Sequence, residues 1–374
     1  MYKKILVFFA VFAILSSVSL LSSSALEYSE LENKIDSLYS TLSEDTQEDL
    51  KSIGAYSADL MTLNNVSFRS IFELIVSKVS KESKGPLTSC AVVIAILILN
   101  AVIDSYRETL KVSAMKEVLS VITTLCITST LVAPVIKLIS HCLATVNDAS
   151  NFMLLYIPIM AAILAFSGHA VTGASYYSYM LLACQCVSQL STKLVSPLLN
   201  IFLGLTVSSS ISSKVNLSSL CAMLSKMIKW LIAFIMTVFS ALMTIKGMIT
   251  TAYDSVTARA VRFTMSSFIP IVGAALSESY KTIQGSVNLL RTGAGVFVIL
   301  AICVVFLPVI LQCLIWLLSL NACKTIGEII GVESPLKLLS SVSSVVSTVF
   351  AITVCIMSVF VISTALLITL GGAS

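Results

Sequence analysis

From residue 87 onward, the sequence consists largely of apolar runs separated by short polar stretches. Runs of roughly 17–25 apolar residues are long enough to cross a hydrocarbon core about 30 Å thick. We therefore predict an all-α polytopic membrane protein with eight transmembrane helices, or seven, since the fourth and fifth runs read equally as two short spans or a hairpin. The eight runs are Leu87–Ile103, Val118–Ser140, Met153–Ala170, Ser175–Ser191, Leu194–Ile211, Trp230–Ile245, Val296–Leu320 and Val342–Leu370.

Composition and motifs exclude several classes of function. The chain is 57% hydrophobic and 11% charged, whereas soluble domains carry about 25% charged residues. No basic cluster with interleaved aromatic residues points to nucleic acid. The only histidines are His141 and His169, and the sequence has no zinc-protease, phosphate-loop, nucleophile-elbow or dinucleotide motif. We therefore predict no catalytic residue, no cofactor and no metal site.

The first 25 residues resemble a secretory signal peptide. Lys3 and Lys4 precede an apolar run that starts at Ile5, and the small residues Ser23 and Ala25 suit a cleavage site after residue 25. The alternative is an uncleaved signal anchor, because apolar character persists to Leu21. Under either reading, residue 26 onward is exported.

Residues 26–86 form an acidic segment that we expect to be exported and helical. The segment holds 11 of the chain's 19 acidic residues. Leu31, Ile35, Leu38 and Leu42 share one helical face, which favours helices over strands. About sixty residues is small for an independent core, so two alternatives stay open: the segment packs on the membrane domain or a partner, or it is a loosely ordered arm. None of the ten cysteines falls in it, which argues against a disulfide framework.

Residues 247–295 form a polar island between the first part of the membrane domain, residues 87–246, and its C-terminal part, residues 296–374. Two amphipathic helices hinged at Pro270 and Gly273 are the simplest reading. Polar side chains recur at helical spacing on both sides of the hinge and form a candidate conduit or docking stripe: Ser255, Arg259, Arg262, Ser266, Ser277, Lys281, Gln284, Asn288 and Arg291.

Two interpretations of this island remain open. Its helices lie in the membrane interface with basic residues at the headgroups, or they enter the membrane against protein and line a pore or gate. Counting spans from an exported residue 26 places the island outside the cell, although Arg259 and Lys281 belong to a basic stretch that the positive-inside rule would keep inside. The charge distribution therefore conflicts with the span count at this island.

From Trp230 onward, the sequence resembles the stage III sporulation protein AE family of endospore-forming bacteria. The resemblance rests on residues 252–256, 259–263, 276–278 and above all 267–273, which read Ser-Phe-Ile-Pro-Ile-Val-Gly. The layout of signal peptide, short exported arm and polytopic domain also fits. Ala274 stands where the family usually has a second glycine, and Glu278 where it usually has an aspartate.

The resemblance implies a function that composition does not show. Members of this family are non-enzymatic subunits of a mother-cell membrane complex that joins a forespore partner and forms a channel or secretion apparatus needed after engulfment. By this similarity, the chain would lie in the mother-cell membrane around the forespore, with other membrane subunits and a separate ATPase subunit as partners besides the lipid bilayer. An oligomer is compatible with this reading.

The alternative function is a stand-alone secondary transporter for a small solute. Prolines at positions 134, 158, 197 and 308 together with the polar stripes favour it. The two halves of the chain show no internal repeat, which such transporters commonly have.

Overall fold

The computed structural model describes residues 34–35, 37–57, 60–64, 66–110, 115–211, 218–268, 273–331 and 333–370. Every regular element within these ranges is a helix, so the all-α prediction is confirmed. The predicted signal peptide, residues 1–25, and Pro270 of the predicted hinge lie outside the described residues.

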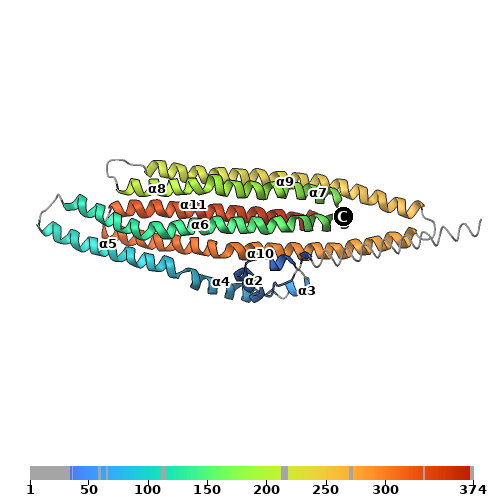
Figure 1. Ribbon diagram of the computed structural model, residues 1–374, viewed down its shortest axis with the longest axis horizontal. Coiled ribbons are helices and arrows are strands. Elements are labelled where there is room, and N and C mark those ends of the chain that lie inside the picture. Colours follow the sequence, from blue (N-terminus) through green and yellow to red (C-terminus); the bar gives the residue numbers. More distant parts are fainter. Residues whose placement is uncertain are drawn as a thin grey trace, which may run out of the picture.

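Long helices that run side by side along the longest axis form the body of the molecule (Figure 1). Five of them are long and apolar enough to cross a membrane, which confirms a polytopic membrane fold. These five are α5 (Lys84–Leu110), α6 (Met115–Phe166), α9 (Ser218–Phe268), α10 (Gly273–Ile330) and α11 (Glu333–Leu370).

The helices differ from the expected eight or seven spans because separate predicted runs share one helix. Helix α6 contains Val118–Ser140 and most of Met153–Ala170. The polar residues between them, 141–152, include neither glycine nor proline, so no strong helix breaker separates the two runs. Helix α10 has 58 residues, a length of about 87 Å at 1.5 Å per residue, against a hydrocarbon core of about 30 Å.

The fourth and fifth predicted runs also follow one another without a hairpin turn. Helix α7 (Ala170–Leu190) leads through a π-helical turn, η1 (Ser191–Val195), into α8 (Ser196–Ile211). Pro197 lacks the N–H that would bond the carbonyl four residues earlier, and wider π turns often accommodate such a local defect. The residues from 170 to 211 therefore form one continuous helical run.

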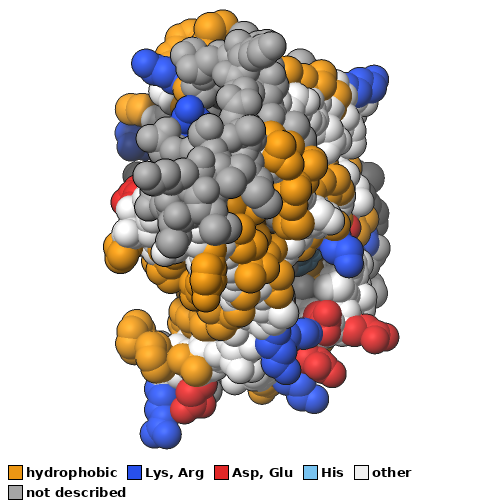
Figure 2. All heavy atoms as spheres, turned by 90° about the vertical axis from the view of Figure 1, so that its left-hand side faces the viewer, with side chains coloured by type: hydrophobic (Ala, Val, Ile, Leu, Met, Phe, Trp, Pro, Cys, Tyr) orange, Lys and Arg blue, Asp and Glu red, His pale blue; other side chains and the backbone are white. Residues whose placement is uncertain are grey.

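The acidic arm packs on the bundle. Helices α2 (Glu44–Ser52), α3 (Leu60–Leu63) and α4 (Phe68–Glu82) all contact α10 and lie beside its middle (Figure 1). Lys78 Nζ of α4 lies 2.6 Å from Asp49 Oδ2 of α2, which joins the two helices. On the face shown in Figure 2, apolar side chains cover much of the described surface, most acidic side chains lie toward the lower end, and basic ones occur at both ends.

Two glycines allow the helices to approach closely. Helix α10 packs most extensively on α11, where a side chain at Gly295 would meet Ile368 at 2.5 Å. Helix α7 packs on α6, where a side chain at Gly173 would lie 2.8 Å from the carbonyl oxygen of Ala161. Small residues at such contacts are typical of membrane helix packing.

Candidate functional site

The turn between α6 and α7 is the local structure around which the candidate site is built. Gly168 has φ +87°, a conformation that glycine adopts at little cost. The His169 amide donates to the Leu164 carbonyl at 2.8 Å, and the Gly168 amide donates to that of Ala165 at 3.1 Å. This pattern is the Schellman ending of a helix, and it turns the chain directly into α7.

Asp254 of α9 caps α7 from outside that helix. Its two carboxylate oxygens accept hydrogen bonds from the backbone amides of Val171 at 3.1 Å and Thr172 at 2.8 Å. The side chain is 2% exposed. A carboxylate at a helix N-terminus satisfies amides that have no partner within the helix, and the helix dipole favours the negative charge. Asp254 is therefore a buried acid with well-matched partners.

Gln284 of α10 holds the other side of the same turn. Its Nε2 donates to the carbonyl oxygen of Ser167 at 2.8 Å, and its side chain is buried. The island's α9 half supplies Asp254 and its α10 half supplies Gln284. Both halves of the island thus hold the α6–α7 turn.

Arg291 lies two turns after Gln284 and is the largest fully buried side chain among the described residues, at 1% exposure. Its electrostatic neighbours include the Tyr156 hydroxyl of α6 and the His169 ring. Within the described part of the chain, Arg291 Nε and Nη1 have no hydrogen-bond partner, and no ion pair joins the guanidinium to a carboxylate. A buried charge without a partner is costly and is therefore often functional.

Other buried polar atoms also lack a hydrogen-bond partner. Among the described residues they occur on α6, in the α6–α7 turn and on α7, α9 and α10. Thr128 of α6 is set apart from the others, because it precedes Tyr156 by 28 residues, about 42 Å along the helix at 1.5 Å per residue. We call the remaining set the Arg291 cluster, and its unpartnered groups come from Tyr156, His169, Thr172, Tyr176, Thr251, Asn288 and Arg291. The rest of the bundle pairs its buried polar atoms well, as folded proteins usually do.

His169 lies in the turn, outside the five candidate membrane spans. Burial lowers the pKa of its imidazole; the positive charge of Arg291 lowers it further, and the Asp254 carboxylate opposes both effects. The imidazole is therefore held in its neutral form more strongly than a solvated histidine.

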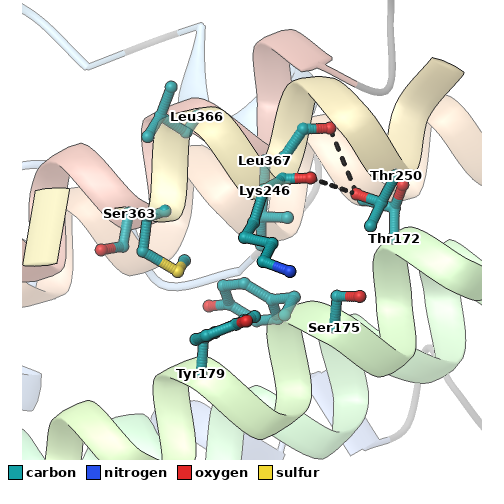
Figure 3. Close-up of a pocket in the computed structure, with 11 residues that line it drawn as sticks. Thr172, Ser175, Tyr179, Lys246, Thr250, Ser363, Leu366 and Leu367 are labelled. Atoms are coloured by element: carbon teal, nitrogen blue, oxygen red, sulfur yellow. Dashed lines mark hydrogen bonds between the residues drawn. The ribbon is translucent and has the colours of Figure 1, made fainter. Parts of the chain in front are cut away.

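A small cavity adjoins the cluster between α7, α9 and α11 (Figure 3). Its volume is about 20 Å³, room for roughly one water molecule. Thr172 and Tyr176 belong both to the cavity wall and to the Arg291 cluster. Figure 3 shows the Lys246 amine directed toward the α7 side of the cavity, near Ser175 and Tyr179. Because Lys246 is exposed, it marks the cavity's outer end.

The predicted polar stripe divides between two environments. On α9, Ser255 is partly exposed and donates to the Ala252 carbonyl, and Arg259 is exposed. On α10, Gln284 and Arg291 are buried and Asn288 is partly buried. The backbones of Arg262, Ser266, Ser277 and Lys281 are helical, but their side chains are outside the description. Gly273 is the first residue of α10.

Sequence reasoning missed the three residues that join the stripe to the rest of the bundle: Tyr156, His169 and Asp254. One signal was available for Asp254, since a lone acid in a mostly apolar helix is a functional candidate by itself. Tyr156 and His169 carried no such signal, because only packing brings them to Arg291.

The described residues contain no group of three or more histidine, cysteine or acidic side chains that could hold a metal ion. Cys184 is buried and Cys186 is exposed, so these two thiols point to different surroundings. Cys90 of α5 and Cys323 of α10 do meet, with their sulfur atoms 2.9 Å apart.

Comparison with known proteins gives two findings. The family model described as stage III sporulation protein AE matches residues 52–371. Stage III sporulation protein AE of Bacillus subtilis (strain 168) is 25% identical over 236 residues, which are 63% of this chain and 59% of that relative. The match therefore spans less than two thirds of the relative's length. No solved structure matches the chain.

Proposed function

Because the chain belongs to the stage III sporulation protein AE family, we propose that it is a non-enzymatic membrane subunit of the complex that connects mother cell and forespore during endospore formation. The observation that carries this proposal is the family match over residues 52–371. A role in sporulation follows from the family itself. Membership in a channel or secretion complex, a place in the mother-cell membrane and an ATPase partner are parts of the proposal.

The fold supports a subunit that works by holding or passing material. Five helices are long and apolar enough to cross a membrane. The polar residues that are buried together belong to helix packing and to the Arg291 cluster. Such an arrangement suits a conduit or an assembly surface. A separate ATPase would then supply the energy that moves the cargo.

A deletion of the gene in its own host tests this role. We expect vegetative growth and engulfment to proceed normally, and late gene expression in the forespore and heat-resistant spores to be lost. A plasmid copy of the wild-type chain should restore spores. Sporulation of the deletion strain at the wild-type frequency would overturn the proposal.

The Arg291 cluster is also the observation that favours the second candidate, a stand-alone secondary transporter. Buried ionisable residues within membrane helices often mark solute pathways. Proteoliposomes that contain only this protein distinguish the two functions. Uptake of a solute coupled to a proton or sodium gradient would support the transporter, and a subunit of a larger complex should show none.

A further inference from the structure

Two cysteines on different helices lie in direct contact. The sulfur atoms of Cys90 on α5 and Cys323 on α10 are 2.9 Å apart, although 233 positions separate the two residues in the sequence. Nine cysteines belong to the described part of the chain, and no hydrogen bond joins any other two of them. Cys142, for example, contacts the hydroxyl of Thr353. Cys90 and Cys323 are therefore placed to react with each other.

Backbone contacts fix the position of both sulfur atoms. Cys90 Sγ lies 3.3 Å from the carbonyl oxygen of Ser319, and Cys323 Sγ lies 3.7 Å from that of Cys90. Farther along the same two helices, a side chain at Gly327 of α10 would lie 3.7 Å from Leu97 of α5. The close packing of α5 on α10 thus holds the two thiols together.

The two thiols differ in how far they are buried. Cys90 is 9% exposed and Cys323 is 1% exposed. Cys90 lies six residues after Lys84, where α5 begins, and Thr88 and Ala91 next to it are exposed. A thiolate reacts only with an oxidant that can reach it. An oxidant therefore meets Cys90 first, and Cys323 is positioned to react second.

The predicted location of α5 suits this chemistry. Helix α5 follows the acidic arm, which the sequence predicts to be exported. Disulfides form and persist outside the cytoplasm. A disulfide bond is about 2.05 Å long, so the two sulfur atoms have to approach by roughly 0.9 Å.

We propose that Cys90 and Cys323 are a disulfide-forming pair that joins α5 to α10, with a small disulfide compound as the oxidant. The Cys90 thiolate attacks one sulfur of this compound, which forms a mixed disulfide and releases the first thiol. The Cys323 thiolate then attacks the Cys90 sulfur and releases the second thiol. Two electrons pass from the cysteine pair to the compound, and the two thiol protons balance the two thiols released.

The bond would connect the arm to the candidate site. Helix α5 continues from α4 of the arm, and α10 carries Gln284 and Arg291. A cross-link restricts the unfolded chain, and the effect grows with the length of the closed loop. Because this loop spans 233 positions, the oxidised protein should unfold at a higher temperature than the reduced protein.

The proposal concerns a covalent bond that the family match does not assign, and it goes beyond the role in sporulation. Its failure would leave that role intact, because the deletion experiment above does not depend on a disulfide. Equally, the bond would stand if the deletion strain sporulated normally.

Thiol mapping of the full-length protein in detergent micelles tests the pair. The reduced protein is treated with 4,4′-dithiodipyridine, a small apolar disulfide, and the remaining thiols are blocked with N-ethylmaleimide under denaturing conditions. Peptides are then identified by mass spectrometry. We expect one linked product that contains both Cys90 and Cys323, and its loss on treatment with dithiothreitol. Recovery of Cys90 as a blocked thiol or as a thiopyridyl adduct, in place of the linked product, would overturn the proposal.

Matched variants test the order of the two steps. Cys323→Ser should accumulate the thiopyridyl adduct on Cys90, because the second thiol is absent. Cys186→Ser removes an exposed thiol of α7 and should form the Cys90–Cys323 bond as the wild type does.

Thermal unfolding gives an independent measurement. Reduction should lower the unfolding midpoint of the oxidised wild type and leave that of Cys323→Ser unchanged. The mapping of the wild type needs no substitution, so it decides the question even if a variant does not fold. A cross-link from Cys90 to any other cysteine in place of Cys323 would also contradict the proposal.

Discussion

Among the residues that the structure describes, two cationic side chains are buried, Lys78 and Arg291, and they differ in whether they have a partner. Lys78 of the arm is 9% exposed, and its amine lies 2.6 Å from the Asp49 carboxylate. Arg291 of the bundle is 1% exposed, and two of its donors lack a partner among the described residues. Lys78 thus joins two helices of the arm, whereas no ion pair of Arg291 occurs among the described residues.

The difference separates a structural charge from a functional one. Removing one member of a buried ion pair leaves an uncompensated charge and is strongly destabilising, whereas exchanging both for apolar residues is often neutral. An unpaired buried charge lowers stability from the start and persists only if something other than folding requires it. The following variants test this distinction, measured as unfolding of the purified protein in detergent micelles.

Asp49→Ala should have the largest effect. It leaves Lys78 buried without its partner, and we expect a loss of about 3–5 kcal/mol in the free energy of unfolding. The double variant Asp49→Leu with Lys78→Met should recover most of that loss, since no charge then remains buried. A loss below about 1 kcal/mol for the single variant would mean that the pair behaves as a solvated surface pair.

Asp254→Ala should have the next largest effect. This variant tests whether Asp254 is a charge that the fold requires, as Asp49 is. Two amides of α7 lose a charged acceptor, so we expect a loss of about 1.5–3 kcal/mol. Asp254→Asn keeps one acceptor oxygen and should lose less. Equal unfolding midpoints for Asp254→Ala and the wild type would show that the Asp254 cap on α7 does not stabilise the fold.

Arg291→Met should change stability in the opposite direction. We expect a protein as stable as the wild type or more stable by about 1 kcal/mol, because an unpaired buried charge is replaced by an apolar chain of similar length. Arg259→Gln, at an exposed site of α9, serves as the control and should leave stability unchanged. If Arg291→Met were destabilised as strongly as Asp49→Ala, Arg291 would be a structural charge like Lys78.

The smallest expected effect is a pH dependence at His169, whose pKa is lowered by burial and by Arg291. Below the ordinary histidine pKa of 6.5, the unfolded chain binds a proton that the folded protein does not. Stability should therefore fall as pH decreases through this range, by less than about 1.4 kcal/mol per pH unit. His169→Gln should have a flatter profile, and an unchanged profile would show that His169 does not contribute.

The comparison also shows how much of the fold and of the candidate site can be predicted from the sequence. Apolar runs were enough to predict an all-α polytopic membrane protein, and the Ser267–Gly273 run carried the family resemblance. Helical spacing identified the stripe, but it could not tell which face points inward. The stripe is exposed at Arg259 on α9 and buried at Arg291 on α10, and that difference depends on neighbours distant in sequence.

The number and ends of the helices were harder to predict for a related reason. A polar stretch between two apolar runs is normally predicted to be a loop that connects two membrane spans. Residues 141–152 instead continue α6, with backbone hydrogen bonds that stay within the helix. The cap from Asp254 joins residues more than eighty positions apart. No periodicity in the sequence records such a contact.

One measurement tests most directly whether the Arg291 cluster is the functional part of this sporulation protein. Arg291→Met is placed at the native locus beside a control, Lys226→Gln, which removes an exposed cation of α9 outside the predicted stripe; heat-resistant spores are counted after protein levels in the membrane are matched. We predict that Arg291→Met grows and completes engulfment normally but fails to form spores, whereas Lys226→Gln sporulates like the wild type. Wild-type spore numbers from Arg291→Met would contradict the account.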